Sequence, residues 1–335
     1  MTDDTMVRNA GNGAGMPPAP DGGDGAGAAA APDAQRRAAR GAFARVGFAC
    51  LLLLISAFLL QTALLSLFPE AMRVLLSNSW GYYAFAMLSQ YAVGLPLFWL
   101  LLRPLPRQTW PDVRLSAHSW WEFLLMCFGL GFGGNLIGQF VTQFFSLLLG
   151  VNAVNPLEAL LTGTALAPQF VSVCLVAPVI EELLFRKLLI DRLHRFGDRA
   201  AMLASAAAFG LLHGNFNQLF YACFIGLLLG YVYCRTHRLR YTILLHMALN
   251  LLGGVLPAAL LSIPYAAALY AVGLLAVYLA GLVRFFNRKK QAVFAPGALP
   301  PGRGSGRAMF GNPGMVLYAI ASFALCIFTL LSTSN

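Results

Sequence analysis

Three short motifs place ionisable or amide side chains inside strongly apolar segments of the chain. Their members are Glu181, Glu182 and Arg186 in EExxxR, Phe209 and His213 in FxxxH, and His246 and Asn250 in HxxxN. A charged side chain at the centre of a membrane helix costs several kcal/mol, roughly 2.5–3.5 on insertion scales. Groups retained at that cost are expected to serve a function.

The two adjacent glutamates differ in the partner that a helix offers them. Glu182 and Arg186 are i,i+4 neighbours with the acidic residue first, which is the favourable order for an ion pair. Glu181 lies roughly 100° further round the helix and has no such partner. A structural ion pair therefore accounts for Glu182 and Arg186 and leaves Glu181 as a candidate base.

Each of the other two motifs has an ordinary structural reading beside a chemical one. His213 precedes Gly214 at a predicted helix end, where a histidine is often a cap or a core group. His246 and Asn250 share one helix face, where polar groups also join membrane helices to each other. Taken singly, neither motif identifies a reaction.

Together the motifs supply the parts for hydrolysing an amide without a serine or cysteine nucleophile. Glu181, in an otherwise apolar stretch of helix before Glu182, can act as a general base on water, and His213 can share that proton or hold the water. His246 and Asn250 can donate hydrogen bonds to the oxyanion of a tetrahedral intermediate. The sequence contains neither GxSxG nor HExxH, the motifs of two other hydrolase mechanisms.

Composition indicates the elements that must position these residues. Of 335 residues, 59% are apolar and 11% charged, with a mean hydropathy of +0.69, whereas soluble domains carry about 25% charge. Nine apolar segments are expected, at about 46–68, 80–102, 120–150, 167–186, 200–213, 216–234, 241–260, 264–284 and 313–331. The sequence thus predicts an all-α, polytopic transmembrane helical bundle of about eight or nine spans.

The basic residues predict the orientation of the bundle. With a cytoplasmic N-terminus and nine spans, 22 of the 23 Lys and Arg residues fall on the cytoplasmic side, and Arg73 is the exception. The net charge of +10 is then an orientation signal, so nucleic-acid binding is not predicted.

The chain divides into four predicted regions. They are a disordered low-complexity tail (1–40), two N-terminal spans with a basic loop (41–118), a catalytic membrane core (119–260), and C-terminal spans (261–335) with a basic linker at 285–312. The six cysteines show no metal-ligand spacing and are expected to be small core residues. His118, His194 and His237 lie beside basic loop residues and are expected at the surface.

The three motifs, in this order, resemble the CPBP family of CaaX proteases and bacteriocin-processing enzymes, also called Abi. The resemblance covers roughly residues 120–255, and FGLLHGNFNQLFYACFIGLLLGYVYCRT resembles the bacterial branch. It implies an intramembrane endopeptidase of a bacterial plasma membrane, with an endoplasmic-reticulum membrane as the second choice. Glu181 and His213 would activate the water, His246 and Asn250 would form the oxyanion hole, and Glu182, Arg186 and Phe209 would shape the site.

The resemblance leaves the cofactor open, since the family has also been described as metalloproteases. Glu181, His213 and His246 would then bind zinc with a position left for water. The metal-free reading is favoured because Asn250 is a poor zinc ligand and an understandable oxyanion donor, so no cofactor is assigned and zinc stays an alternative.

Three functions remain as hypotheses. The favoured one is a protease acting on a membrane-associated peptide or protein, with the lipid bilayer as its surroundings. The second is a catalytically silent scaffold or immunity factor, and the third is a transporter whose Glu and His residues relay protons. The complete set Glu181, His213, His246 and Asn250 favours the protease, although these motifs do not distinguish prenylated substrates from others.

Overall fold

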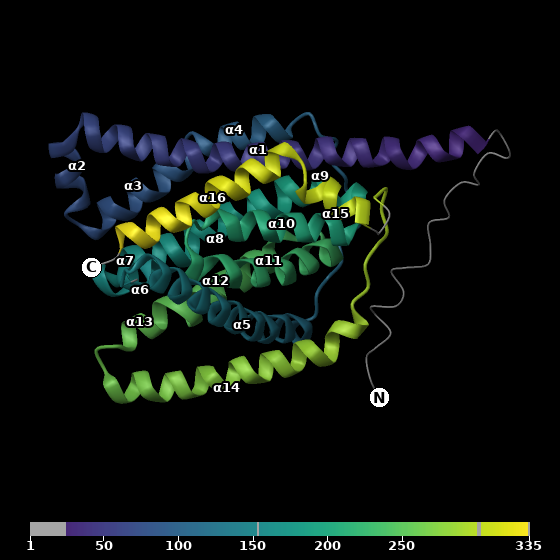
Figure 1. The fold of residues 1–335 in the computed structure, drawn as a ribbon. Helices are drawn as coiled ribbons and strands as arrows, with labels where there is room; N and C mark the ends of the chain where they lie inside the picture. The colour runs from purple at the N-terminus through teal and green to yellow at the C-terminus, as the bar shows by residue number, and fades with distance from the viewer. Residues whose placement is uncertain (1–24, 153, 300–302, 334–335) are drawn as a thin grey trace, which may run out of the picture.

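The chain folds into a bundle of helices, shown as a computed structural model in Figure 1. The structure describes residues 25–152, 154–299 and 303–333, with the side chains of residues 33–152, 154–299 and 304–333. Within these ranges every regular element is a helix, which confirms the predicted all-α bundle.

The elements are listed here in chain order. They are α1 (Gly25–Leu67), α2 (Pro69–Leu76), α3 (Ser79–Tyr91), α4 (Gly94–Leu102), α5 (Ala117–Leu149), α6 (Pro156–Gly163), α7 (Leu166–Gln169), the π-segment η1 (Phe170–Val176), α8 (Ala177–Glu182), the π-segment η2 (Leu183–Ile190), α9 (Asp191–Leu193), the 3₁₀ turn η3 (His194–Phe196), α10 (Asp198–Leu212), α11 (Phe216–Thr236), α12 (Leu239–Asn250), the π-segment η4 (Leu251–Val255), α13 (Leu256–Leu260), α14 (Pro264–Arg288), the 3₁₀ turn η5 (Lys289–Gln291), α15 (Arg303–Phe310) and α16 (Pro313–Ser332).

Seven stretches of the described chain are long and apolar enough to cross a membrane. They correspond to α1, α3–α4, α5, α11, α12–α13, α14 and α16. The remaining two predicted segments form the interrupted helix α7–α9 and the 15-residue helix α10. At 1.5 Å per residue, α10 is about 22 Å long, less than the roughly 30 Å hydrocarbon core. Most of its residues are buried between α11, α16 and η2, so α10 is a core helix.

The N-terminal helix begins earlier than the sequence suggested. The tail was expected to reach residue 40, but α1 starts at Gly25, while residues 1–24 lie outside the described part. Ala39, Ala42 and Phe43 are almost fully buried where α15, α16 and η3 pack on α1. Alanine has the highest helix propensity, and this packing supplies the burial that an alanine-rich stretch lacks on its own.

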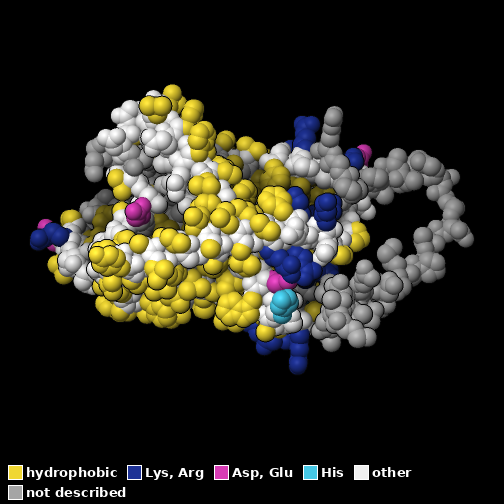
Figure 2. All heavy atoms as spheres, turned by 90° about the horizontal axis from the view of Figure 1, so that it is seen from below, with side chains coloured by type: hydrophobic (Ala, Val, Ile, Leu, Met, Phe, Trp, Pro, Cys, Tyr) yellow, Lys and Arg dark blue, Asp and Glu magenta, His cyan; other side chains and the backbone are white. Residues whose placement is uncertain are grey.

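Charge is distributed unevenly along the bundle. In Figure 2, the visible Lys and Arg side chains gather toward one end, and hydrophobic side chains cover much of the remaining face. We call this the basic end; α9, α15 and the C-terminal end of α14 lie there in Figure 1, and α2, which carries Arg73, lies at the other. This separation agrees with the charge pattern read from the sequence.

Glycines allow two pairs of helices to approach to backbone contact. A Cβ atom on Gly281 of α14 would lie 2.0 Å from the Leu125 carbonyl of α5. A Cβ atom on Gly47 of α1 would lie 2.2 Å from the backbone of Gly314 in α16. Small residues at such crossings are a usual way of joining membrane helices, because hydrocarbon offers no hydrophobic drive for association.

Gly281→Ala should therefore lower the thermal unfolding temperature of the purified protein, since overpacking a close contact costs about 1–3 kcal/mol. Gly273→Ala on the same helix is the matched control, because its Cβ would meet nothing within 4 Å. Equal unfolding temperatures for the two variants in detergent would show that this crossing is not tightly packed.

Candidate functional site

The structure brings most of the predicted site residues together inside the bundle. Glu181 and Glu182 end α8, Arg186 lies in η2, and His246 and Asn250 occupy the last two turns of α12. The buried ring of Phe209, on α10, lies between the imidazoles of His213 and His246. Three helices thus converge on one cluster of polar side chains.

The predicted ion pair between Glu182 and Arg186 is confirmed and completely buried. Arg186 Nε lies 3.0 Å from Glu182 Oε2, and both side chains have zero exposure. Arg186 Nη1 donates a hydrogen bond to Ser205 Oγ at 2.9 Å, and its guanidinium lies over the Phe209 ring, 5.1 Å from the centroid. The pair therefore ties the helix of the glutamates to α10.

His246 lies between the two glutamates. Its Nδ1 is 3.1 Å from Glu182 Oε1, and its Nε2 is 3.7 Å from Glu181 Oε2. Because Glu182 is paired with the permanently charged Arg186, its carboxylate accepts the hydrogen bond and Nδ1 carries the proton. Nε2 then accepts in the neutral ring and donates in the imidazolium, so an oxyanion-donor role requires protonated His246.

Glu181 has a different environment from its neighbour. Its side chain is 15% exposed, and Oε1 accepts a hydrogen bond from the Tyr91 hydroxyl at 3.3 Å. Within the described residues this is the sole hydrogen bond of the Glu181 side chain. The carboxylate is therefore oriented by neutral and histidine partners, without a guanidinium, as the sequence predicted.

His213 is held at the C-terminal end of α10. Its Nδ1 donates a hydrogen bond to the Phe209 carbonyl at 2.9 Å, because a carbonyl can only accept. Nε2 is left with a lone pair that can accept a hydrogen bond from water. Across the described part of the chain no hydrogen bond or ion pair joins His213 to Glu181, so direct proton sharing between them is not part of this arrangement.

Asn250 is fixed through an irregularity in the neighbouring helix. Its Nδ2 donates to the Val173 carbonyl at 2.8 Å, and Val173 lies in η1. In the i→i−5 register of this segment, seen in the bond from Ala177 N–H to Ser172 O, Val173 would accept from residue 178. Residue 178 is proline and has no N–H, so the Val173 carbonyl is free for Asn250. One Asn250 N–H remains as a donor.

The alternative zinc set of Glu181, His213 and His246 is not preassembled. No group of three or more His, Cys, Asp or Glu side chains among the residues described here is close enough to hold a metal ion. The side chains as placed therefore do not fit a three-ligand zinc site, and we assign no chemical step to a metal.

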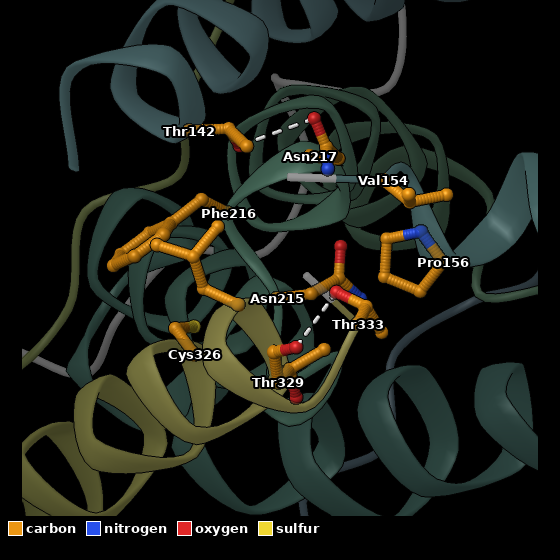
Figure 3. A pocket seen from close by; sticks show the side chains of 10 residues that line it. Thr142, Val154, Pro156, Asn215, Phe216, Asn217, Cys326, Thr329 and Thr333 are labelled. Atoms are coloured by element: carbon orange, nitrogen blue, oxygen red, sulfur yellow. Dashed lines mark hydrogen bonds between the residues drawn. The ribbon is translucent and has the colours of Figure 1, made fainter. Parts of the chain in front are cut away.

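Two cavities lie outside this cluster. One of about 10 Å³, room for about one water, lies near Thr142, Asn217 and the C-terminal end of α16 (Figure 3). The other, about 730 Å³, is an apolar groove lined by side chains of α5, η4, α13 and α14. Leu252, two residues after Asn250, contributes to its wall.

Two histidines expected at the surface are instead packed against the loop that follows α4. The rings of His194 and His237 both stack on Trp110, at 3.9 and 4.1 Å between centroids. His194 lies 2.8 Å from Asp198, and the His237 side chain is only 8% exposed, near Asp191. The expectation was wrong because this loop folds back over the helix ends, whereas His118 is 80% exposed as predicted.

Two residues around the glutamates were not identified from the sequence. Tyr91 comes from α3, and Ser205 lies in the alanine-rich α10. An isolated Tyr or Ser in an apolar segment carries no spacing signal, and only tertiary packing brings these two to their partners.

Comparison with known proteins locates a family core in the same region. Residues 163–252 match the family model described as "Type II CAAX prenyl endopeptidase Rce1-like". The chain is 24% identical over 159 residues to the "Putative membrane peptidase YdiL" of Bacillus subtilis (strain 168). That alignment covers 45% of this chain and 62% of the relative, so the chain spans less than two thirds of it. No solved structure matches the chain.

Removing Arg186 should be costly, because it leaves the buried Glu182 carboxylate without its counter-charge. We expect Arg186→Ala to lose about 3–5 kcal/mol of folding free energy together with any activity. Arg73→Ala is the matched control, because it breaks a Glu70–Arg73 pair whose side chains are 78–79% exposed. Thermal unfolding in detergent measures both variants, and equal effects would contradict a structural role for the buried pair.

Proposed function

On the premise that the chain is a member of the CPBP family through its Rce1-like core, we propose that it is an intramembrane endopeptidase. It would hydrolyse a peptide bond of a membrane-associated substrate with a water activated by Glu181. The observation that carries the proposal is the placement of Glu181 and Glu182 on either side of His246, with Arg186 paired to Glu182 alone.

In the first step, water attacks the peptide carbonyl carbon and its proton passes to Glu181. His213 Nε2, free to accept, holds the other water hydrogen and so orients the attacking oxygen. The new oxyanion accepts hydrogen bonds from the free N–H of Asn250 and from Nε2–H of protonated His246.

In the second step, the tetrahedral intermediate collapses. The carbonyl re-forms, the C–N bond breaks, and the proton on Glu181 passes to the leaving nitrogen. Collapse gives a carboxylic acid and an amine, and Glu181 returns to its carboxylate form. The proton of the new acid then passes to the amine, so the final products are a carboxylate and an ammonium group. No covalent enzyme intermediate is needed, in keeping with the lack of a serine or cysteine motif for that role.

The apolar groove suggests the substrate class. Its volume of about 730 Å³ and its nearly continuous apolar lining suit a hydrocarbon chain attached to the peptide. The description of the matching family model contains the word prenyl, and a prenyl group is a hydrocarbon chain. Leu252, two residues after Asn250, belongs to the groove wall, so the lipid chain would lie on the α5 and α14 side of the helix that carries Asn250.

The first test is cleavage of lipidated and membrane-anchored peptides by the detergent-purified protein. Glu181→Ala should lose activity by at least about 100-fold while remaining folded, because the base is lost but the buried ion pair is kept. His246→Ala should also be inactive. Product formation is followed by mass spectrometry, with and without a zinc chelator.

The cleavage assay, together with the cellular phenotype and a transport assay, distinguishes the hypotheses. If both variants lose cleavage activity and the chelator has no effect on wild type, the result supports a water activated by glutamate. If the chelator abolishes cleavage and added zinc restores it, the metal-dependent mechanism with Glu181, His213 and His246 as ligands replaces the metal-free one. If wild type cleaves nothing while each variant keeps the cellular phenotype, the silent scaffold or immunity factor is favoured. Proton-dependent transport that survives Asn250→Ala would indicate a transporter.

Filling the groove should discriminate between lipidated and plain peptides. Gly273 lines it and has open space at its Cβ position, so Gly273→Leu should lower cleavage of the lipidated peptide about tenfold relative to the plain one. Gly133→Leu is the matched control, since that glycine also has open space and lies outside the groove. An unchanged preference in Gly273→Leu would exclude the groove as the lipid site.

A further inference from the structure

We propose that Tyr91 is a positioning residue for the catalytic carboxylate of Glu181. The inference rests on the proposed function, because it concerns the base of that reaction. Tyr91 lies outside the family core of residues 163–252, on α3. The N-terminal helices would then contribute a side chain to the site, in addition to packing against the family core.

The contact is selective for one of the two glutamates. The Tyr91 hydroxyl donates to Glu181 Oε1 at 3.3 Å, while Glu182 is held by Arg186 and His246. Glu181 Oε2 faces His246 Nε2 at 3.7 Å. Tyr91 and His246 therefore approach different oxygens of the same carboxylate, which fixes the plane of that carboxylate.

A proline places Tyr91 at this depth in the bundle. Pro96 has no N–H, so the Ala92 carbonyl lacks its helical partner, and the helix is interrupted between Tyr91 and Gly94. At the break, Gly94 packs against Leu53 of α1, where an added Cβ would lie 2.5 Å from Leu53 Cδ1. Tyr91 is the last residue of α3 and is 9% exposed, so its ring is held in the core.

The first part of α3 is fixed to the junction between α6 and α7 by two further hydrogen bonds. Ser79 Oγ accepts from the Ala165 N–H at 3.0 Å, and Tyr83 OH lies 3.1 Å from Thr164 Oγ1. These contacts are made at the start of α3, and Tyr91 makes its own at the end. Tyr83 is thus a natural control, a buried tyrosine on the same helix whose hydroxyl meets a threonine.

The experiment compares Tyr91→Phe with Tyr83→Phe in steady-state cleavage of a membrane-anchored peptide. Loss of a hydrogen bond to a charged group corresponds to about a 10- to 100-fold effect. We expect kcat of Tyr91→Phe to fall by that factor with KM unchanged, and Tyr83→Phe to stay within about twofold of wild type. A KM rise at constant kcat, or equal losses in both variants, would overturn the inference in favour of a packing role.

A second measurement uses a folded protein in which Tyr91 is retained. With 3-fluorotyrosine placed at position 91 or 83, Glu181→Ala should shift the fluorine resonance at 91 and leave the one at 83 in place. An unmoved resonance at 91 would show that no contact with Glu181 exists.

Failure of this inference is distinguishable from failure of the proposed function. If wild type cleaves, Glu181→Ala does not, and Tyr91→Phe matches wild type, Glu181 remains the base and the positioning role of Tyr91 is rejected. If wild type and Glu181→Ala are equally active or equally inactive, the proposed function is rejected, and so is the role of Tyr91.

Discussion

The buried ion pair of Glu182 and Arg186 is the interaction on which the rest of the site depends. Neither side chain has any exposure, so each charge is stable in the bundle only while the other is present. Arg186 also reaches Ser205 and Phe209 on α10, and Glu182 reaches His246 on α12. One ion pair therefore sets the relative position of the three helices that carry the site.

This arrangement gives two chemically identical neighbours different roles. The turn of a helix directs Glu182 to a guanidinium and an imidazole, and Glu181 to a phenol and the other nitrogen of that imidazole. The charge of Glu182 is neutralised by Arg186 in the buried ion pair, whereas the carboxylate of Glu181 can accept a proton. π-segments flank α8 on both sides and a third follows α12, and the one containing Val173 frees a carbonyl that orients Asn250.

Much of this could be predicted from the sequence because the relevant signals are local. Helical periodicity and apolar composition predicted the all-α bundle, and i,i+4 spacing predicted the Glu182–Arg186 pair.

The length of α1 was underestimated because its burial depends on α15 and α16, which lie far away in the chain. Tyr91, Ser205 and the stacking of His194 and His237 on Trp110 were missed for the same reason. The hydrogen bond between Asn250 and Val173 could not be predicted either, because the sequence does not show which helix packs beside Asn250. The catalytic roles of the four polar residues remain predictions.

The central claim is the division of labour between the adjacent glutamates, and exchanging each in turn for its isosteric amide tests it most directly. The measurement is single-turnover peptide cleavage and thermal unfolding on the same preparations of Glu181→Gln and Glu182→Gln. Our account predicts that Glu181→Gln unfolds like wild type but does not cleave, and that Glu182→Gln loses stability along with activity because Arg186 loses its counter-charge. A stable, inactive Glu182→Gln beside an active Glu181→Gln would contradict the account and reverse the two roles.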